Sequence, residues 1–445
     1  MIEYKMTLTD EEKEILEGKQ GETKQKMMET LVLFGDIFNA KRMVKVTHKQ
    51  GHLVTSFGIP LLKPLYGTME ELINDNCKAE GGFTMDPRPL DYKNVKCNIL
   101  EKIVFDKILY GKQKEYEEQL KKVGLTDEDS FSCTSYLKEC GNRPAKGDIL
   151  SWAESSAVVF ANSVLGARCN RNSGMLDLFG SILGVVPEFG FLLDENRKAT
   201  WIIEIKTTKI PEAQILGSAI GMKVMDEVPY IIGLDDYLGT ELTDFNEAYL
   251  KDMGAASASN GAVGLFHVEN LTPEAKELKR SLIKEGAKTY VIDDEELERV
   301  YKSYPNMWKK KDKDPDLCFI GCPHLTLSQT KVWHDNIKQS LLDHNLKKVT
   351  CRVVLTLAPK VKEQFIKTYK NEYDELYEMG VTVSSICPLM YTNNPLVHSK
   401  AIITNSNKLR TYSMARYFKD EEFLDTVKQN DKVEIKEDGT VIILD

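Results

Sequence analysis

Two cysteines in the C-terminal half stand at the ends of short apolar runs of the kind that form β-strands. Cys322 follows the run 317–320 in the motif Gly-Cys-Pro-His, and Cys387 follows the run 381–386 in Ser-Ser-Ile-Cys-Pro. Thiolates ligate iron and iron–sulfur clusters, and an iron with an open position acts as a Lewis acid on a hydroxyl or a carboxylate. The pair therefore predicts a metal centre, to which His324 adds an imidazole. Buried structural thiols and a hydrogen-bonded core histidine are the alternative.

A dense polar run at residues 152–171 offers groups that can bind an anion. Arg168 and Arg171, with Asn170 between them, present forked donors that can grip a carboxylate or a phosphate. A loop that is held by acidic neighbours is the alternative for the same residues. Together with the thiols, the two arginines suggest a metal-assisted site for a small anionic molecule.

The start of this run carries hydroxyl and carboxylate groups. Glu154, Ser155 and Ser156 can orient a substrate or relay protons, or they can satisfy the first backbone amides of a helix. A buried helix is predicted at 151–165, which is rich in Ala, Val and Ser and contains neither Pro nor Gly. Asn162 falls on nearly the same face as Ser155, so this polar stripe must meet either a hydrogen-bonded neighbour or a ligand.

Four further candidates lie in loops and turns outside this run. His48 stands in a loop that can line a pocket, whereas His52 is expected to be exposed at the surface. Asp86 is either an oxygen ligand for the metal or a turn former. Ser406 and Lys408 follow a predicted strand, and they either close the pocket or form a simple turn.

The elements that must position these groups alternate along the second half of the chain. Apolar runs bounded by turn residues predict strands, and helical periodicity between them predicts helices. This alternation is typical of a parallel α/β sheet, whose ligand sites gather beyond the carboxyl ends of the strands, where Cys322 and Cys387 stand. Strands are predicted at 201–205, 230–232, 263–268, 289–292, 317–320, 353–357 and 381–386, and helices at 328–342 and 361–379.

Three other segments have recognisable local patterns. Thr9 and Glu12 have the spacing of a capping box, which predicts a helix start. The small polar residues 255–261 indicate a loop or a close approach of two backbones. A hairpin is predicted at 433–444, around the turn residues Asp438-Gly439.

Length and charge limit the classes of protein. A chain of 445 residues can hold two or three domains. The net charge of −9 argues against a general nucleic-acid surface. There is no apolar stretch of membrane-spanning length and no export signal, so we expect a cytoplasmic protein that binds neither nucleic acid nor membrane. We divide it into an α/β region at 1–255, a βαβ region with both cysteines at 256–415, and a tail at 416–445.

The nine cysteines do not form a recognisable local site. No Cys-x-x-Cys spacing occurs, so a closed zinc site is poorly supported, and a reducing compartment disfavours a disulfide framework. Any metal site must therefore take its cysteines from distant positions in the chain.

Motifs in a fixed order along most of the chain resemble those of one known family, the large subunit of aconitase X, a compact branch of the aconitase superfamily. They are Met6-Thr-Leu-Thr-Asp-Glu-Glu, Leu16-Glu-Gly-Lys-Gln-Gly21, Val46-Thr-His-Lys-Gln-Gly51, Cys133-Thr-Ser-Tyr-Leu137, Ser151-Trp-Ala-Glu-Ser-Ser-Ala157, Asn162-Ser-Val-Leu-Gly-Ala-Arg-Cys-Asn-Arg171, Leu193-Asp-Glu-Asn-Arg197, Leu271-Thr-Pro-Glu-Ala275, Gly321-Cys-Pro-His324 and Thr404-Asn-Ser406. The run from Asn162 to Arg171 is the most specific.

The resemblance implies a multi-domain aconitase-like fold with mostly parallel sheets, helices on their faces and an active-site cleft between domains. It implies dehydration of cis-3-hydroxy-L-proline or mevalonate 5-phosphate, an iron centre, and an active site completed by a small swivelling domain. No segment of this chain resembles that domain, so the resemblance implies a separate small subunit. Iron held by Cys322 and Cys387 would polarise the leaving hydroxyl, and Arg168 and Arg171 would fix the acidic end of the substrate.

Three departures from the family pattern leave the substrate open. The family usually has Thr at the position of Cys169, Pro at that of Ser135 and Asn at that of Asp86. A degenerate paralogue that binds a small anionic metabolite without turnover is therefore an alternative. A redox iron–sulfur carrier is a weaker one, because only two cysteines are well placed.

Overall fold

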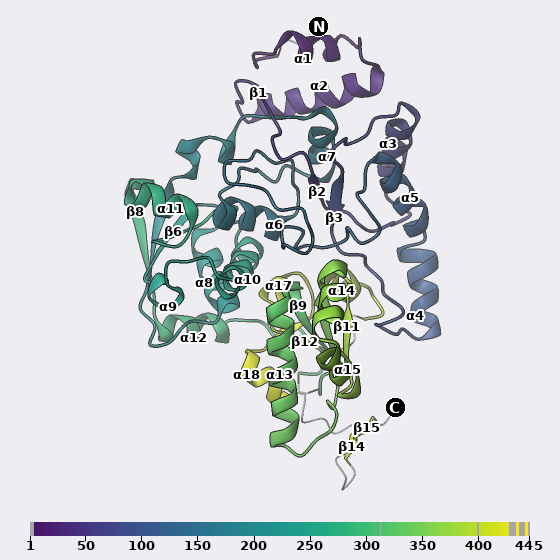
Figure 1. The fold of residues 1–445 in the computed structure, drawn as a ribbon, viewed down its shortest axis with the longest axis vertical. Helices are drawn as coiled ribbons and strands as arrows, with labels where there is room; N and C mark the ends of the chain where they lie inside the picture. Colours follow the sequence, from purple (N-terminus) through teal and green to yellow (C-terminus); the bar gives the residue numbers. More distant parts are fainter. Residues whose placement is uncertain (1–3, 312, 398–399, 427–432, 436–440, 444–445) are drawn as a thin grey trace.

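The computed structural model describes residues 4–311, 313–397, 400–426, 433–435 and 441–443, and its second half contains two parallel sheets (Figure 1). The first sheet has the order β7-β6-β5-β8, and its strands are β5 (Ala199–Ile205), β6 (Pro229–Ile232), β7 (His267–Val268) and β8 (Ile283–Ile292). The second has the order β11-β10-β9-β12-β13, with β9 (Leu317–Leu325), β10 (Arg352–Leu357), β11 (Val381–Ser384), β12 (Ile402–Thr404) and β13 (Arg416–Tyr417). Every strand pair in both sheets is parallel, so the predicted α/β fold is confirmed.

Helices flank both sheets, as the alternation in the sequence requires (Figure 1). Around the first sheet lie α8 (Ala213–Val224), α9 (Asp235–Leu238), α10 (Asp244–Asn260), α11 (Pro273–Leu278) and α12 (Asp294–Lys302). Around the second lie α13 (Leu327–Asp343), α14 (Pro359–Thr368), α15 (Lys370–Glu378), α16 (Pro388–Thr392), α17 (Asn407–Tyr412) and α18 (Asp420–Thr426). All nine residues of β9 are buried, which explains its continuous apolar run.

Several expected segments differ from the structure. The strand expected at 263–268 is confined to His267–Val268, and the strand expected at 317–320 continues to Leu325, so Cys322 lies within it. The single helix expected at 361–379 is two helices, α14 and α15, because Tyr369 between them has a non-helical φ of −125°. The loop expected at 255–261 is wrong, since α10 continues to Asn260. The close backbone approach offered as the alternative is present: a Cβ atom on Gly221 of α8 would lie 2.5 Å from the carbonyl oxygen of Ser257 in α10.

The N-terminal half is built from short elements. Thr9 caps α1 (Asp10–Leu16) in a capping box with Glu12, as predicted. The remaining elements are α2 (Glu22–Ile37), β1 (Met43–Lys45), β2 (Gly51–Leu53), α3 (Lys63–Asn74), β3 (Phe83–Met85), α4 (Ile99–Val104), the π-helix η1 (Phe105–Leu109), α5 (Gln113–Val123), α7 (Gly174–Leu183) and β4 (Val185–Pro187). β1 pairs antiparallel with β4, whereas β2 and β3 form a parallel two-stranded ribbon.

The helix expected at 151–165 lies at the junction of the two halves. It consists of α6 (Ser155–Phe160) and a π-helical continuation, η2 (Ala161–Leu165), and Gly166 ends it in the left-handed conformation with φ 73°. It begins four residues later than expected because the Glu154 side chain caps it. The largest hydrophobic core connects this helix with both sheets.

The C-terminal tail contains the predicted hairpin. Strands β14 (Val433–Ile435) and β15 (Val441–Ile443) pair antiparallel, and the expected turn at Asp438-Gly439 lies outside the described residues. None of the helices in the described part of the chain has the length and apolar character of a membrane span. The first sheet takes strands from both sides of residue 255, and the division of the chain at residues 255 and 415 stays a prediction.

Candidate metal centre and active site

The β2–β3 ribbon places a histidine and a carboxylate side by side. Parallel pairing of His52 with Thr84 puts both side chains on one face, where His52 Nδ1 lies 2.8 Å from Thr84 Oγ1. Asp86 follows on the same face, because side chains alternate along a strand. The expectation that His52 is exposed is wrong: the ring is fully buried and packs edge-on against Trp152 at 5.5 Å.

The start of α6 brings together three of the predicted residues. The Glu154 carboxylate accepts hydrogen bonds from the backbone amide of Ala157 at 2.6 Å and from Ser156 Oγ at 2.7 Å, and Ser155 Oγ lies 3.4 Å away. The Glu154 side chain therefore satisfies a backbone amide at the start of the helix, which is one of the two interpretations of these residues. The same carboxylate also pairs with Lys408, a residue 254 positions away in sequence, so it is more than a cap.

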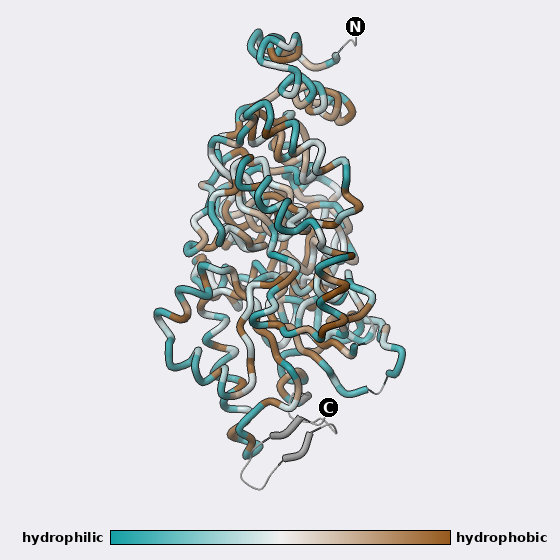
Figure 2. Tube along the Cα trace, turned by 90° about the vertical axis from the view of Figure 1, so that its right-hand side faces the viewer, coloured by the Kyte–Doolittle hydropathy of each residue, from teal (hydrophilic) through white to brown (hydrophobic). Residues whose placement is uncertain are grey.

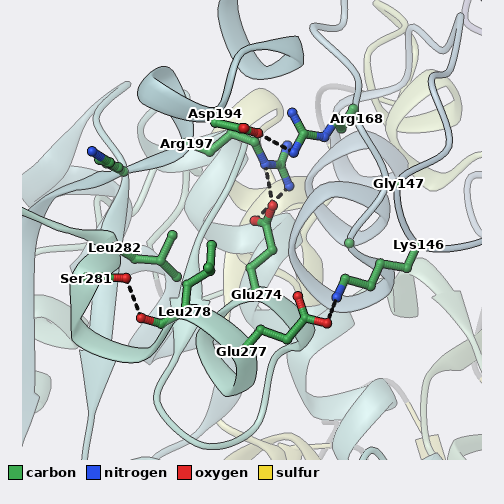
Figure 3. Close-up of a pocket in the computed structure, with 12 residues that line it drawn as sticks. Lys146, Gly147, Arg168, Asp194, Arg197, Glu274, Glu277, Leu278, Ser281 and Leu282 are labelled. Carbon is green, nitrogen blue, oxygen red and sulfur yellow. Dashed lines mark hydrogen bonds and ion pairs between the residues drawn. The ribbon is translucent and has the colours of Figure 1, made fainter.

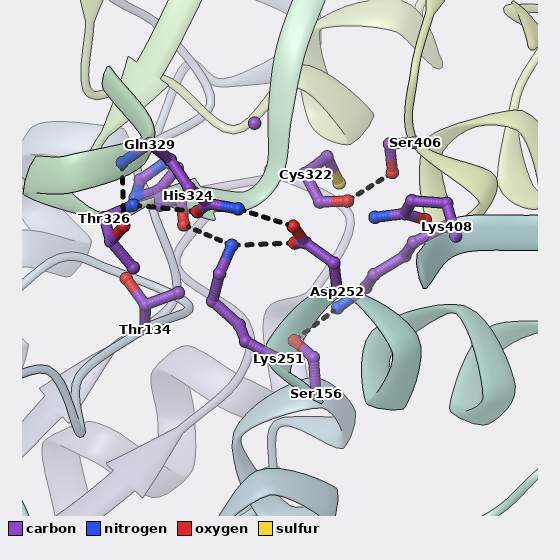
Figure 4. Close-up of polar contacts among 12 residues, drawn as sticks. Thr134, Ser156, Lys251, Asp252, Cys322, His324, Thr326, Gln329, Ser406 and Lys408 are labelled. Atoms are coloured by element: carbon purple, nitrogen blue, oxygen red, sulfur yellow. Dashed lines mark hydrogen bonds and ion pairs between the residues drawn. The ribbon is translucent and has the colours of Figure 1, made fainter. Parts of the chain in front are cut away.

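Helix α17 delivers Lys408 to this point. Ser406 caps α17 by accepting the amide of Leu409 at 3.1 Å, and its hydroxyl donates to the carbonyl oxygen of Cys322. Lys408 Nζ also donates to Ser156 Oγ at 3.2 Å. The predicted residues Ser406 and Lys408 thus join the cysteine-bearing strand β9 to the start of α6 (Figure 4).

His52, Asp86 and Glu154 could hold a cation. One ligand atom from each lies within 4.8 Å of the other two. Among the described residues, His52 Nε2 and one Asp86 oxygen are buried without a hydrogen-bond partner. Buried polar atoms without partners are rare in folded proteins, so these two are free to accept a metal ion or a ligand.

Burial and the Glu154–Lys408 pair set the protonation states in this centre. Burial lowers the pKa of His52 to about 4, and burial together with the charge of Glu154 raises the pKa of Asp86 to about 8. Burial would raise the pKa of Glu154, but the charge and hydrogen bond of Lys408 outweigh it and bring that pKa to about 2. At neutral pH the centre therefore holds a neutral imidazole, a protonated Asp86 and an ionised Glu154.

Three thiols face this centre. After the larger effect of burial, the charge of Cys322 raises the pKa of both Cys133 and Cys387, so the two predicted cysteines and a third are near enough to influence one another electrostatically. Asp86 also raises the pKa of Cys387, and the charge of Lys408 opposes the increase at all three thiols. Sequence reasoning missed Cys133, whose irregular loop carries no local sign of a ligand.

Buried polar contacts fix the ends of the strands that carry the cysteines (Figure 4). His324 Nε2 donates to the carbonyl oxygen of Ile386 at 3.1 Å, which ties the end of β9 to the residue before Cys387. Lys251 in α10 is fully buried, and its Nζ donates to the His324 carbonyl oxygen at 3.1 Å and to Asp252 at 2.7 Å. Both nitrogens of His324 have partners, since Nδ1 lies 3.4 Å from Ser132 Oγ. The imidazole therefore positions the cysteines and leaves no nitrogen free for a metal.

His48 is linked to the centre indirectly, through Asn142 and Thr84. Its Nε2 lies 2.7 Å from Asn142 Oδ1, and Asn142 Nδ2 donates to Thr84 Oγ1 at 2.9 Å. Because Thr84 in turn contacts His52, a hydrogen-bonded chain leads from His48 to the centre. Asn142 was missed by the sequence analysis, since its partners lie more than fifty residues away in sequence.

Arg168 lies at the other end of the α6–η2 helix, in a separate cavity of about 400 Å³ (Figure 3). Its guanidinium donates to the carbonyl oxygen of Leu192 at 2.9 Å and to Asp194 at 2.5 Å. The eleven residues from 155 to 165 rise about 16 Å at 1.5 Å each, which separates Arg168 from Glu154. The structure therefore does not bring Arg168 into the centre, and its part in substrate binding stays a prediction.

The two predicted asparagines serve the backbone in the structure. Asn162 Nδ2 donates to the carbonyl oxygens of Cys169 and Gly264 at 2.9 and 2.8 Å. Asn170 Nδ2 donates to the carbonyl oxygen of Phe189 at 2.8 Å, and its Oδ1 accepts the amide of Phe191 at 2.7 Å. These contacts hold the loop around Arg168, and a direct role in substrate binding stays a prediction for both.

Arg171 follows Arg168 by three residues in the same loop. Ile149 and Arg168 form a parallel bridge, and Cys169 Sγ contacts the carbonyl oxygen of Trp152, two residues before Glu154, at 3.3 Å. Arg171 has a left-handed φ of 55°, and its charge opposes the burial-driven rise in the pKa of Cys169. Among the described residues the Arg171 guanidinium has no carboxylate partner.

Family models match two adjoining parts of the chain. The model of the aconitase X first domain matches residues 5–195, and that of the aconitase X second domain matches residues 199–302. Together they span more than half of the chain.

Characterised relatives and a solved structure agree with these matches. The phosphomevalonate dehydratase large subunit of Methanocaldococcus jannaschii is 31% identical over 92% of this chain and 95% of its own. That of Thermococcus kodakarensis is 34% identical over 73% of this chain and 76% of its own. The cis-3-hydroxy-L-proline dehydratase of Hypocrea jecorina is 28% identical over 64% of this chain and 46% of its own. The crystal structure of Thermococcus kodakaraensis aconitase X in its holo-form matches with a TM-score of 0.76 and 28% identity, and it covers 94% of this chain and 99% of that one.

Proposed function

The chain belongs to the aconitase X family, and from that premise we propose that it is the large subunit of an iron-dependent hydro-lyase. The substrate is a small anionic hydroxy acid from which the enzyme removes water. The observation that carries the proposal is the single buried centre in which Cys133, Cys322 and Cys387 meet Asp86 and the Glu154–Lys408 pair.

The residues of this centre fit an iron or iron–sulfur group. Three thiols are the soft donors that such a group prefers, and the unpartnered oxygen of Asp86 adds a fourth donor. We propose that Cys133, Cys322 and Cys387 hold the iron, with Asp86 beside them. The iron would supply a Lewis acid that weakens the bond to the leaving hydroxyl. The unpartnered His52 Nε2 is left for substrate or a further ligand.

The chain's own residues supply charge and hydrogen bonds. Ser155 and Ser156 keep the Glu154 carboxylate in place, and Lys408 keeps it ionised, so Glu154 orients the substrate as a hydrogen-bond acceptor and, with a pKa of about 2, does not store the abstracted proton. The charge of Lys408 also opposes the rise that burial causes in the pKa of the thiols, which works in favour of the thiolate form that binds metal. Arg171 is the guanidinium that we assign to the acidic end of the substrate. Through Asn142 and Thr84, His48 fixes the orientation of the neutral His52 ring.

The names of the relatives support two classes of substrate for the proposal. Most of those at 28–34% identity are phosphomevalonate dehydratase large subunits, and two are cis-3-hydroxy-L-proline dehydratases. Coverage of 95% of the Methanocaldococcus jannaschii chain favours a phosphorylated hydroxy acid, with a separate small subunit that closes the site. All nine cysteines are free, which fits a reducing compartment such as the cytoplasm.

Anaerobic co-expression of this chain with its cognate small subunit tests the proposal. We expect iron in the purified complex and elimination of water from phosphomevalonate, followed by mass spectrometry of the product. cis-3-Hydroxy-L-proline is the second substrate to assay. A complex that binds either compound by calorimetry but contains no iron and turns over neither would instead establish the non-catalytic binder.

A further inference from the structure

A group of strongly exposed apolar side chains lies on and beside α4. Five of them form a surface that we call the α4 face, and their exposed fractions are 85% for Leu61, 80% for Ile99, 73% for Leu100, 52% for Ile103 and 63% for Ile108. A single exposed leucine needs no explanation, but a contiguous apolar patch marks a place where another molecule binds.

Local structure holds these five residues together. Ile99, Leu100 and Ile103 fall within one turn of α4, and Ile108 lies in the π-helix that continues it. Leu61 comes from the loop beside it, since Lys112 donates its amide to Gly58 at 3.0 Å. In Figure 2, α4 faces the viewer as a run of hydrophobic colour on the lower half of the molecule.

The inner side of the same segment covers the candidate active site. Phe105 is fully buried and packs on Tyr391 with ring centroids 5.9 Å apart, and Tyr110 Oη donates to the carbonyl oxygen of Met390 at 2.9 Å. Tyr391 and Met390 belong to α16, whose first residue follows Cys387. The inner side therefore closes over a cysteine of the centre, and the outer side carries unsatisfied apolar surface.

The rim of the α4 face is cationic. Lys93, Lys96, Lys102 and Lys107 are exposed, and none of them pairs with a carboxylate among the described residues. Glu101 of the same helix turns inward, where it is buried and pairs with Lys400 at 2.6 Å. The face thus suits a partner with an apolar centre and an acidic rim.

We propose that the α4 face is the docking surface for the small subunit that completes this enzyme. The inference rests on the proposed function, because it takes the partner from the assignment of this chain as a large subunit. A subunit that closes the site must reach the Cys387 side of the molecule, and the α4 face belongs to the segment that packs on α16, next to Cys387. Another apolar cluster, around Ile37 and Phe38 of α2, lies near the top of the molecule in Figure 1, well away from α4 on the right-hand side.

The test compares matched charge insertions in the full iron-loaded chain, titrated with its cognate small subunit by calorimetry. Ile103→Asp should weaken binding roughly 30-fold or more, as expected for a buried anchor. Ile37→Asp alters a side chain of 74% exposure on α2, outside the α4 face, and should leave the affinity within about twofold. Charge reversal of Lys102 and Lys107 to Glu should slow association by about tenfold at low salt and less at high salt. Circular dichroism and iron content show that each variant is folded.

The outcomes separate this inference from the proposed function. If the wild-type complex forms and Ile103→Asp binds as tightly as wild type, the docking surface is wrong and the two-subunit enzyme stands. If the wild-type chain ignores the small subunit but sediments as a dimer that Ile103→Asp dissociates, the occupant is a second copy and the proposal is overturned. If the wild-type chain is a monomer that ignores the small subunit, the assignment as a large subunit fails, and the inference fails with it.

Discussion

Two buried ion pairs lie at opposite ends of the α6–η2 helix, and their surroundings differ. At the amino end, Glu154 pairs with Lys408; at the carboxyl end, Arg197 pairs with Glu274 at 2.7 Å and donates to the carbonyl oxygen of Asn162 at 3.0 Å. Both arrangements suit the helix dipole, because the anion lies at the amino end and the cation donates to a carbonyl near the carboxyl end.

The neighbours of each pair distinguish a structural contact from a reactive one. Arg197 makes bidentate contacts with Glu274 and two backbone contacts, at Phe191 and Asn162, so its donors are well used. Around Glu154 and Lys408, by contrast, His52 and Asp86 retain unpartnered atoms and three thiols have shifted pKa values. The Arg197–Glu274 pair also has a buried unpartnered atom beside it, since His267 Nδ1 lies 3.9 Å from Glu274, and burial lowers the pKa of His267. The amino end differs because two unpartnered groups and three thiols converge on one ion pair, which indicates a place kept for a ligand.

Removing a thiol should give the largest effect and test whether the amino end is the reactive one. Cys133→Ser or Cys322→Ser should lose iron and lower kcat by roughly 10³-fold or more, because the Lewis acid is lost. Iron analysis, absorption spectra and steady-state rates measure this. Cys140→Ser is the control. Cys140 is equally buried, but it lies outside the centre, and no cysteine of the centre affects its pKa. Full activity in Cys322→Ser would remove the metal centre from the mechanism.

Breaking each ion pair should destabilise the protein while affecting function differently. Arg197→Met and Lys408→Met each strand a buried carboxylate and should lower the free energy of unfolding by about 3–5 kcal/mol in urea titrations. Only Lys408→Met should also lose iron. Adding Glu274→Gln to the first variant, or Glu154→Gln to the second, should recover part of the stability, because no uncompensated charge remains. Equal loss of iron in both variants would contradict the division of roles.

The pH dependence of stability should sharpen the same comparison at the amino end. In the iron-free chain the pKa of Glu154 falls from 4.5 to about 2 on folding. Its stabilisation, at most about 3 kcal/mol, is therefore present above pH 4.5 and is lost as the pH falls toward 2. In Lys408→Met the pKa of the buried carboxyl rises above 4.5, so the variant should lose stability as the pH rises above that value. Urea midpoints at pH 4, 5.5 and 7 should thus fall with pH relative to wild type, and parallel profiles would count against the coupling.

The sequence predicts the second half of the fold well, because its signals are local. The strand β9 reads as a continuous apolar run because both of its faces are buried, and Cys322 stands near its carboxyl end. His52 could not be predicted in the same way, since its strand of three residues is too short to show an alternation. Cys133 enters the centre only because its loop meets His324, 191 positions away. Pairings across such distances leave no local pattern.

The positions of the two arginines could not be predicted from the sequence either. Replacing them should give the smallest effects that we predict. The sequence presents Arg168 and Arg171 as a pair, but the structure holds Arg168 beside Asp194 and gives Arg171 no carboxylate partner among the described residues. Arg171→Met should raise KM about tenfold with little change in kcat, as expected when a charged anchor for the ground state and the transition state is lost. Arg168→Met should change KM by less than threefold and stability by less than about 1 kcal/mol, because its ion pair is partly exposed. Steady-state kinetics of both variants with phosphomevalonate show which arginine binds the substrate. A larger increase in KM for Arg168→Met would mean that the substrate binds in the cavity at the carboxyl end of the helix.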